Sequence, residues 1–163
     1  MNLDYYENEL LESIVDKLTE KHYTITTAES CTGGLLSSVL VNVAGVSDVF
    51  KEGYITYSNE AKEKILGVSR QSLDNFTAVS EQVAYEMVCG AARVANADVA
   101  VSVTGVAGPG PSEGNPEGLV YIGVFCKGRI KVEGYNFTGG RQKIREQSVL
   151  TALSLIWNLL SDL

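Results

Sequence analysis

The sequence is poor in the residues on which histidine-based and cysteine-based sites depend. It has 1 histidine and 3 cysteines among 163 residues, and no two cysteines form a CxxC pair. Neither a disulfide framework nor a zinc knuckle is indicated, so no metal site is expected. This cysteine usage is typical of a reducing compartment.

The single histidine, His22, stands at the end of a predicted helix, where a polar residue commonly has a structural role. With His22 set aside, a Ser-His-Asp triad lacks its base. Any hydrolytic base must then be Lys, Tyr, Asp or Glu.

The sequence also lacks an excess of positive charge and a long apolar run. It has 13 Lys+Arg against 20 Asp+Glu, which gives a net charge of -7 and a field that repels nucleic acid and anionic lipid. No run of 18 apolar residues occurs, and the first residues are acidic where a signal peptide would be basic. We therefore expect a cytoplasmic protein that binds neither nucleic acid nor membrane.

What is present is typical of one globular domain over 1–163, since 45% of the residues are hydrophobic and 20% are charged. Hydrophobic spacing predicts helices and strands in alternation, followed by a hairpin. The predicted helices cover 3–21, 32–43, 59–67, 80–96 and 141–160, and the predicted strands cover 23–29, 53–58, 98–106, 119–125 and 129–137. This order predicts an α/β layered domain with a mixed sheet of about five strands.

A single long irregular segment, 107–118, follows the most apolar predicted strand. It contains all 3 prolines and 4 of the glycines. A loop of this length after a buried strand is more often functional than not.

The first motif with possible chemistry is AESCTGG over 28–34, at a predicted strand-to-helix junction. Ser30 would lie on a turn, beside backbone N–H groups that suit an oxyanion or phosphate. The alternative is that Ser30 or Thr32 only caps a helix and the glycines permit a tight turn. Cys31 is a second candidate nucleophile.

The second motif is YSNEAK over 57–62, where Tyr57 ends a predicted strand and Lys62 begins a helix. Both side chains could face the same sheet edge as Ser30. A lysine base needs its pKa lowered from about 10.4 toward about 7 or 8, which requires burial or nearby cations. An exposed, solvated Lys62 is the alternative, and Lys64 competes for the role.

The third motif is TGVAGPG over 104–110, at the end of a buried strand, where α/β sheets commonly bind ligands. It lacks the lysine-serine ending of a Walker loop, so a plain turn is equally consistent with it. Arg141 and Arg145 lie four residues apart on one helix face, as a phosphate clamp would require, although solvated roles are open.

Taken together, TTAESCTGG, GYITYSNEAK, AVSVTGVAGPG and the arginine pair resemble the CinA C-terminal domain family, the nicotinamide mononucleotide amidases. The resemblance covers about Leu10 to Leu160. It implies a three-layer α/β/α fold with a mixed sheet, no cofactor, and a homo-oligomer. The implied substrate is nicotinamide mononucleotide, whose carboxamide would be hydrolysed to nicotinic acid mononucleotide and ammonia. Longer members carry an N-terminal molybdopterin-binding-like domain, which we expect to be absent at this length.

The resemblance also implies roles for individual residues. Ser30 matches the nucleophile, Lys62 the base that activates it, and Tyr57 a partner that orients the pair. The remaining implied contacts are N–H groups for the oxyanion at Thr32, Gly33 and Gly34, ribose or ring contacts at Thr104, Gly105 and the loop with Gly108 through Gly110, and phosphate contacts at Arg141 or Arg145.

Two positions depart from the family pattern, namely Leu119 where a Thr is common and Gly140 where an Asp is common. They motivate a second hypothesis, a nucleotide-binding or regulatory module without catalysis. A third hypothesis is an interaction protein that uses the basic strip 127–145, which holds six bases and one acid.

Overall fold

A five-stranded mixed sheet forms the centre of the computed structural model, which describes residues 5–162. The strands are β1 (Ile25–Glu29), β2 (Phe50–Ile55), β3 (Val99–Gly105), β4 (Leu119–Cys126) and β5 (Arg129–Asn136), in the spatial order β2-β1-β3-β4-β5. β1 pairs in parallel with both β2 and β3. β4 and β5 are antiparallel, and the two-residue link 127–128 joins them as the predicted hairpin.

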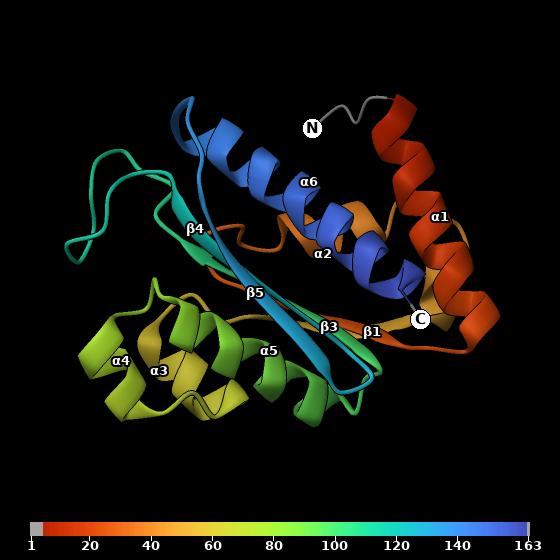
Figure 1. The fold of residues 1–163 in the computed structure, drawn as a ribbon, viewed down its shortest axis with the longest axis horizontal. Coiled ribbons are helices and arrows are strands. Elements are labelled where there is room, and N and C mark those ends of the chain that lie inside the picture. The colour runs from red at the N-terminus through yellow and green to blue at the C-terminus, as the bar shows by residue number, and fades with distance from the viewer. Residues whose placement is uncertain (1–4, 163) are drawn as a thin grey trace.

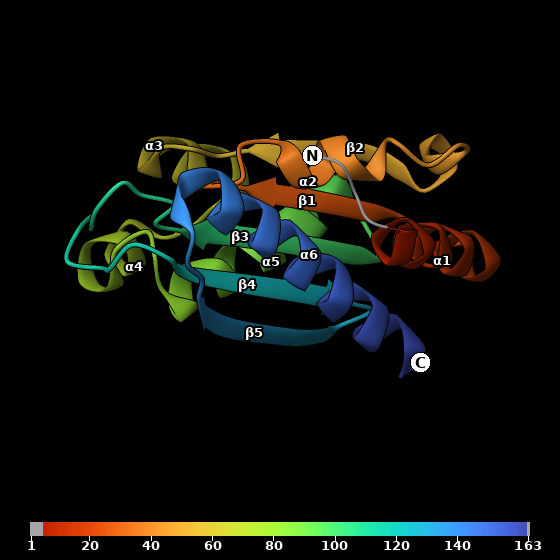
Figure 2. The same ribbon diagram turned by 90° about the horizontal axis from the view of Figure 1, so that it is seen from above.

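Helices cover both faces of the sheet, which gives the predicted three-layer α/β/α arrangement (Figure 1). The helices α1 (Tyr5–Lys21), α2 (Leu35–Leu40) and α6 (Gly140–Ser161) lie on one face, and α3 (Asn59–Ala61), α4 (Arg70–Phe76) and α5 (Glu81–Ala95) lie on the other. A 3-10 turn spans Val46–Asp48 and a π-helical segment spans Lys62–Leu66. Viewed from above, β2 and β5 form the two edges of the sheet (Figure 2).

The core has two parts because β3 is buried on both faces. Val99, Val101 and Val103 pack into the larger cluster with α1, α2 and α6. Ala100 faces the other cluster, which includes α5 residues such as Met87. Alternation of side chains along a strand explains this division, and it is why the strand reads as an unbroken apolar run.

Several predicted boundaries differ from the structure. The strand predicted at 53–58 is β2 at 50–55, and the helix predicted at 32–43 is reduced to α2 at 35–40. The helix predicted over 59–67 does begin at Asn59, as α3, and the π-helical segment that continues it ends before Gly67; its cap is Ser58, whose hydroxyl accepts from the Ala61 N–H. No prediction covered α4, and residues 3 and 4 of the first predicted helix lie outside the described residues.

The topology brings three connecting segments together at one end of the sheet, where the parallel strands finish. β1, β2 and β3 run in parallel, so their carboxyl ends lie at the same edge. Each of the three predicted motifs lies partly in one of the segments that leave these ends, 30–34, 56–58 and 106–118. This edge is where open α/β sheets bind ligands. None of the described helices is long and apolar enough to cross a membrane.

Candidate active site

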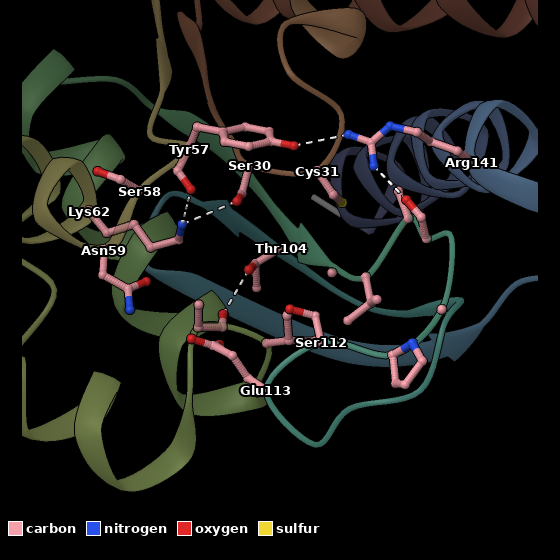
Figure 3. Close-up of a pocket in the computed structure, with 18 of the residues that line it drawn as sticks. Ser30, Cys31, Tyr57, Ser58, Asn59, Lys62, Thr104, Ser112, Glu113 and Arg141 are labelled. Atoms are coloured by element: carbon pink, nitrogen blue, oxygen red, sulfur yellow. Dashed lines mark hydrogen bonds between the residues drawn. The ribbon is translucent and has the colours of Figure 1, made fainter.

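A cavity of about 560 Å³ opens at the carboxyl ends of the parallel strands. Its lining includes Ser30, Cys31, Tyr57, Lys62, Thr104, Glu113 and Arg141 (Figure 3). All three sequence motifs and one residue of the arginine pair thus contribute to a single cavity. Its volume falls within the range of small-molecule sites.

Ser30 follows directly after β1 and is largely buried. Its N–H donates to the Val103 carbonyl at 2.9 Å, which continues the β1–β3 pairing by one residue. Its carbonyl accepts from the Gly33 N–H at 3.0 Å. The backbone of Ser30 is therefore fixed on both sides, and its hydroxyl faces the cavity.

Lys62 meets the Ser30 hydroxyl inside the cavity. Its Nζ lies 3.1 Å from Ser30 Oγ, 2.8 Å from the Thr56 carbonyl oxygen and 3.4 Å from the Tyr57 carbonyl oxygen. Its side chain is 1% exposed, so the alternative of a solvated surface lysine is wrong. Lys64, the competing lysine, is exposed and does not line the cavity.

Burial lowers the pKa of Lys62 to about 8, against the opposing effects of Cys31, Glu113 and Glu60. As an ammonium, Lys62 Nζ donates to all three of its neighbours, the Ser30 hydroxyl and the two carbonyl oxygens. When it loses a proton, the carbonyl oxygens, which can only accept, keep its two remaining N–H bonds. The nitrogen lone pair is then left for the Ser30 hydroxyl proton, which is the arrangement a general base requires.

Cys31 lines the same cavity but cannot compete with Ser30 as the nucleophile. Its thiol is buried, and burial raises its pKa to about 12. The reactive form of cysteine is the thiolate, so this thiol is inert near neutral pH.

Tyr57 contacts Lys62 through its main chain rather than its ring. The ring is 59% exposed, and its hydroxyl accepts a 3.0 Å hydrogen bond from Arg141 Nη2. In Figure 3 the ring points toward Arg141 and away from Lys62. The contact of Tyr57 with Lys62 is thus made by its carbonyl oxygen, not by the ring.

The N–H groups predicted for the oxyanion are mostly engaged elsewhere. The Gly33 N–H donates to the Ser30 carbonyl, and the Gly34 N–H donates to the Glu29 carboxylate at 3.0 Å. These two are excluded as oxyanion donors. The Thr32 N–H has no hydrogen-bond partner within residues 5–162, and the Thr32 hydroxyl is buried there without one.

Glu29 is a residue that the motif analysis missed. It ends β1, is completely buried, and its carboxylate accepts four hydrogen bonds from the segment 34–37. The first residues of α2 have no side-chain cap of their own, since Gly34 stands at the capping position. A buried acid at the end of a strand was the only signal that could have identified it.

The third motif lines the cavity from β3 and its following loop. The Thr104 hydroxyl donates to the Ala78 carbonyl at 2.7 Å. A side chain at Gly105 would come within 2.8 Å of the Leu119 carbonyl, so only glycine fits there. The Gly108 carbonyl accepts from Arg141 Nη1 at 2.6 Å, which joins the loop to α6.

The two arginines diverge although they share a helix face. Arg141 reaches the cavity rim, whereas Arg145 donates to the Thr32 carbonyl at 2.8 Å and does not line the cavity. Both line a smaller adjoining hollow of about 250 Å³. A phosphate clamp that uses both guanidinium groups would thus lie outside the cavity that holds Ser30.

The other candidate features lie apart from the cavity. His22 precedes β1, at the strand end opposite Ser30. In the basic strip, Lys127, Arg129 and Lys131 pair with Asp98, Asp162 and Glu133 respectively, which weakens the case for an interaction surface there. Gly140 has a φ of +82°, a backbone conformation that accounts for glycine at this departure from the pattern.

Comparison with known proteins gives a consistent result. Residues 7–160 match the CinA C-terminal domain family. A CinA-like protein of Kosmotoga olearia is 49% identical over 151 residues, which cover 92% of this chain and 37% of that protein. The chain thus spans little more than a third of the length of this curated relative.

Solved structures give the same result for the fold. The competence/damage inducible protein CihA from Agrobacterium tumefaciens superposes with a TM-score of 0.92 at 39% identity, covering 99% of both chains. A competence-damaged protein (CinA) superfamily protein from Klebsiella pneumoniae gives 0.92 at 34% identity, covering 96% of this chain and 99% of that one.

Proposed function

The chain belongs to the CinA C-terminal domain family, and from that premise we propose that it is an amidohydrolase that converts nicotinamide mononucleotide to nicotinic acid mononucleotide and ammonia. The observation that carries the proposal is the 3.1 Å contact between the buried Lys62 amine and the Ser30 hydroxyl. A serine with a lysine base performs the task of a Ser-His pair without needing a histidine.

The reaction proceeds in two halves. Lys62 takes the Ser30 proton as Oγ attacks the carboxamide carbon, and the lysine ammonium then gives that proton to the leaving nitrogen. The C–N bond breaks, ammonia leaves, and an ester of Ser30 remains. Lys62 next takes a proton from water, the hydroxide adds to the ester carbon, and the Ser30 oxygen leaves with the proton returned by Lys62. The products are a carboxylic acid and the original enzyme.

The cavity supports a mononucleotide as substrate. Its volume of about 560 Å³ leaves room beyond a nicotinamide ring, and Arg141 at its rim offers a guanidinium for phosphate. Thr104 and the loop through Gly108 line the space between Lys62 and Arg141, where a ribose would lie. Of the three predicted oxyanion donors, only the Thr32 N–H lacks a partner among the described residues, but Thr32 is buried and does not line the cavity, so we assign no oxyanion donor.

The test is ammonia release from nicotinamide mononucleotide by the metal-free protein, with the product identified by mass. We expect Ser30→Ala to lower kcat by about 10⁴-fold or more, as loss of a nucleophile does elsewhere. Ser154→Ala, which removes an exposed serine hydroxyl on α6, is the matched control and should turn over normally. Full activity in Ser30→Ala would refute the proposal.

The same assay gives a pH dependence. Because Lys62 acts as a base only when neutral, and burial lowers its pKa to about 8, kcat should rise with pH through about 8 and then level off. Binding of the nucleotide without turnover at any pH would instead favour the regulatory module, the second hypothesis.

A further inference from the structure

Glu29 lies beside the catalytic pair but has no part in the reaction proposed above. Its side chain is 0% exposed, and a carboxylate so buried must have its oxygens fully hydrogen-bonded. One oxygen accepts from the N–H groups of Gly34 and Leu36, both at 3.0 Å. The other accepts from Ser37, at 2.8 Å from its N–H and 2.6 Å from its hydroxyl.

These four bonds close a loop that contains Ser30. The chain leaves β1 at Glu29, passes through Ser30 and the two glycines Gly33 and Gly34, and returns to the Glu29 carboxylate at the start of α2. Two further bonds hold the loop, one within it from the Gly33 N–H to the Ser30 carbonyl and one from Arg145 on α6 to the Thr32 carbonyl. Together with the bond from the Ser30 N–H to the Val103 carbonyl, this closure fixes the backbone that carries the Ser30 hydroxyl.

The main chain of Glu29 is linked to Lys62, the partner of Ser30. Its carbonyl oxygen accepts from the Thr56 N–H at 2.9 Å, and the Thr56 carbonyl in turn accepts from Lys62 Nζ at 2.8 Å. One residue is thus bonded through its side chain to the loop of the nucleophile, and through its backbone to the segment that holds the base.

We propose that Glu29 is a positioning residue, whose carboxylate sets Ser30 Oγ within reach of Lys62 and so determines the reactivity of the serine. This inference rests on the proposed function, in which Ser30 and Lys62 act together. A nucleophile displaced by about 1 Å from its base can lose about 100-fold in rate.

The experiment compares Glu29→Gln with Glu86→Gln. Glutamine keeps the size of the side chain, but its NH₂ group cannot accept from an N–H, so one side of the Glu29 network is lost. Glu86 is the matched control, because its carboxylate also accepts bonds from an N–H and a serine hydroxyl at a short helix, α4, and it does not line the cavity. Each variant is measured for kcat, KM, thermal stability and labelling of Ser30 by a fluorophosphonate.

The fluorophosphonate reads Ser30 without the nucleotide, since Oγ displaces fluoride and the adduct is seen by intact mass. We expect Glu29→Gln to lower kcat and the labelling rate together, by about 100-fold, with KM unchanged. Glu86→Gln should lower thermal stability and leave both rates unchanged. Ser37→Ala removes one of the four bonds and should give a smaller loss in the same two rates, which keeps the test valid if Glu29→Gln does not fold.

The outcomes separate the two proposals. If wild type is labelled at Ser30, does not hydrolyse the nucleotide, and Glu29→Gln is labelled more slowly, the positioning role holds and the proposed substrate is wrong. Equal labelling of folded Glu29→Gln and wild type would overturn the positioning role whatever the substrate. A change confined to KM, or no labelling of wild-type Ser30, would overturn it as well.

Discussion

Two carboxylates cap short helices in this protein, and they differ in how much else supports the helix start. Glu29 serves α2, which has no side-chain cap of its own. Glu86 serves α4, where Ser69 already caps the helix by accepting from the Ser72 N–H at 3.0 Å. Burial raises the pKa of Glu86, but its bonds from Ser72, Gln82 and Ser69 outweigh this and lower the pKa below its ordinary value.

The two helix starts differ in the number of side chains that accept hydrogen bonds from them. At α4 a serine and a carboxylate share the exposed N–H groups, so the loss of one leaves the other, with water close by. At α2 one carboxylate accepts from three N–H groups, those of Gly34, Leu36 and Ser37, and it is fully buried from solvent. The segment 34–37 therefore depends on one side chain, Glu29. The start of α4 depends on two, so we expect it to keep its structure when one of them is replaced.

After Ser30→Ala, the largest expected effect comes from Lys62→Met, which removes the base and a buried amine together. Loss of a general base lowers kcat by about 10²- to 10⁴-fold. The fold should become more stable at pH 7, by up to about 3 kcal/mol, because burial disfavours the charged amine and holds its pKa near 8. Urea unfolding of both proteins at pH 7 and pH 10 measures this.

The stability of the wild-type protein depends on pH because Lys62 has a lower pKa in the folded than in the unfolded protein. Between about 8 and 10.5 the unfolded lysine binds a proton and the folded one does not, so wild-type stability rises with pH in this window. The advantage of the methionine should shrink over the same window. Lys64→Met, at the exposed lysine of the same segment, should show no such gain, and an equal gain there would contradict the explanation.

The second prediction concerns Gly53 in β2, which adjoins the support of Glu29. A side chain there would meet Thr27 Oγ1 at 2.4 Å and Ser37 Oγ at 3.1 Å, a pair that is itself hydrogen-bonded at 2.7 Å. We expect Gly53→Ala to cost about 1 to 3 kcal/mol of stability by overpacking, and to lower kcat because Ser37 moves against Glu29.

Gly134→Ala is the matched control for that prediction, because a side chain there would meet the Tyr121 ring at 2.8 Å, on β5 and away from the cavity. Denaturant unfolding and kcat are measured on both variants. An equal fall in kcat for Gly134→Ala and Gly53→Ala would mean that overpacking anywhere in the sheet lowers activity. The support of Glu29 would then have no special effect on the site.

The smallest effect is expected from Ser69→Ala, which removes the cap of α4. The loss should be about 1 kcal/mol of stability with kcat unchanged, as measured by unfolding and by ammonia release. Ser58→Ala removes a similar cap, but from α3, which leads directly into Lys62. It should lower stability by a similar amount and kcat as well, and unchanged kcat in both would show that capping does not govern the site.

The sequence was sufficient for features that depend on local pattern. The buried strand β3, the hairpin and the long last helix follow from runs and periods of apolar residues. The edge strand β2 was misplaced because its sequence, FKEGYI, is largely exposed and has no clear alternation. The helix α4, RQSLDNF, is short and nearly without apolar periodicity, so it left no signal.

For the candidate site, the motifs brought Ser30, Lys62 and Thr104 to one cavity, but their environments came from tertiary contacts. Burial of Lys62 depends on a π-helical segment and on carbonyls of the preceding residues, which spacing does not reveal. The same holds for Glu29 and the N–H groups of Gly33 and Gly34. Which acceptor a backbone N–H uses is decided by packing, so a glycine-rich turn alone could not predict an oxyanion site.

Because β2 is an edge strand, the sheet holds Lys62 less firmly than it holds Ser30. Ser30 continues β1, which is flanked by strands on both sides, whereas Lys62 is carried by the chain that leaves β2, held by a neighbour on one side only. Edge strands open at lower free energy than central ones. Fraying of β2 alone would separate Lys62 from Ser30 while the other four strands stay paired. The protein would therefore lose activity under conditions milder than those that unfold it.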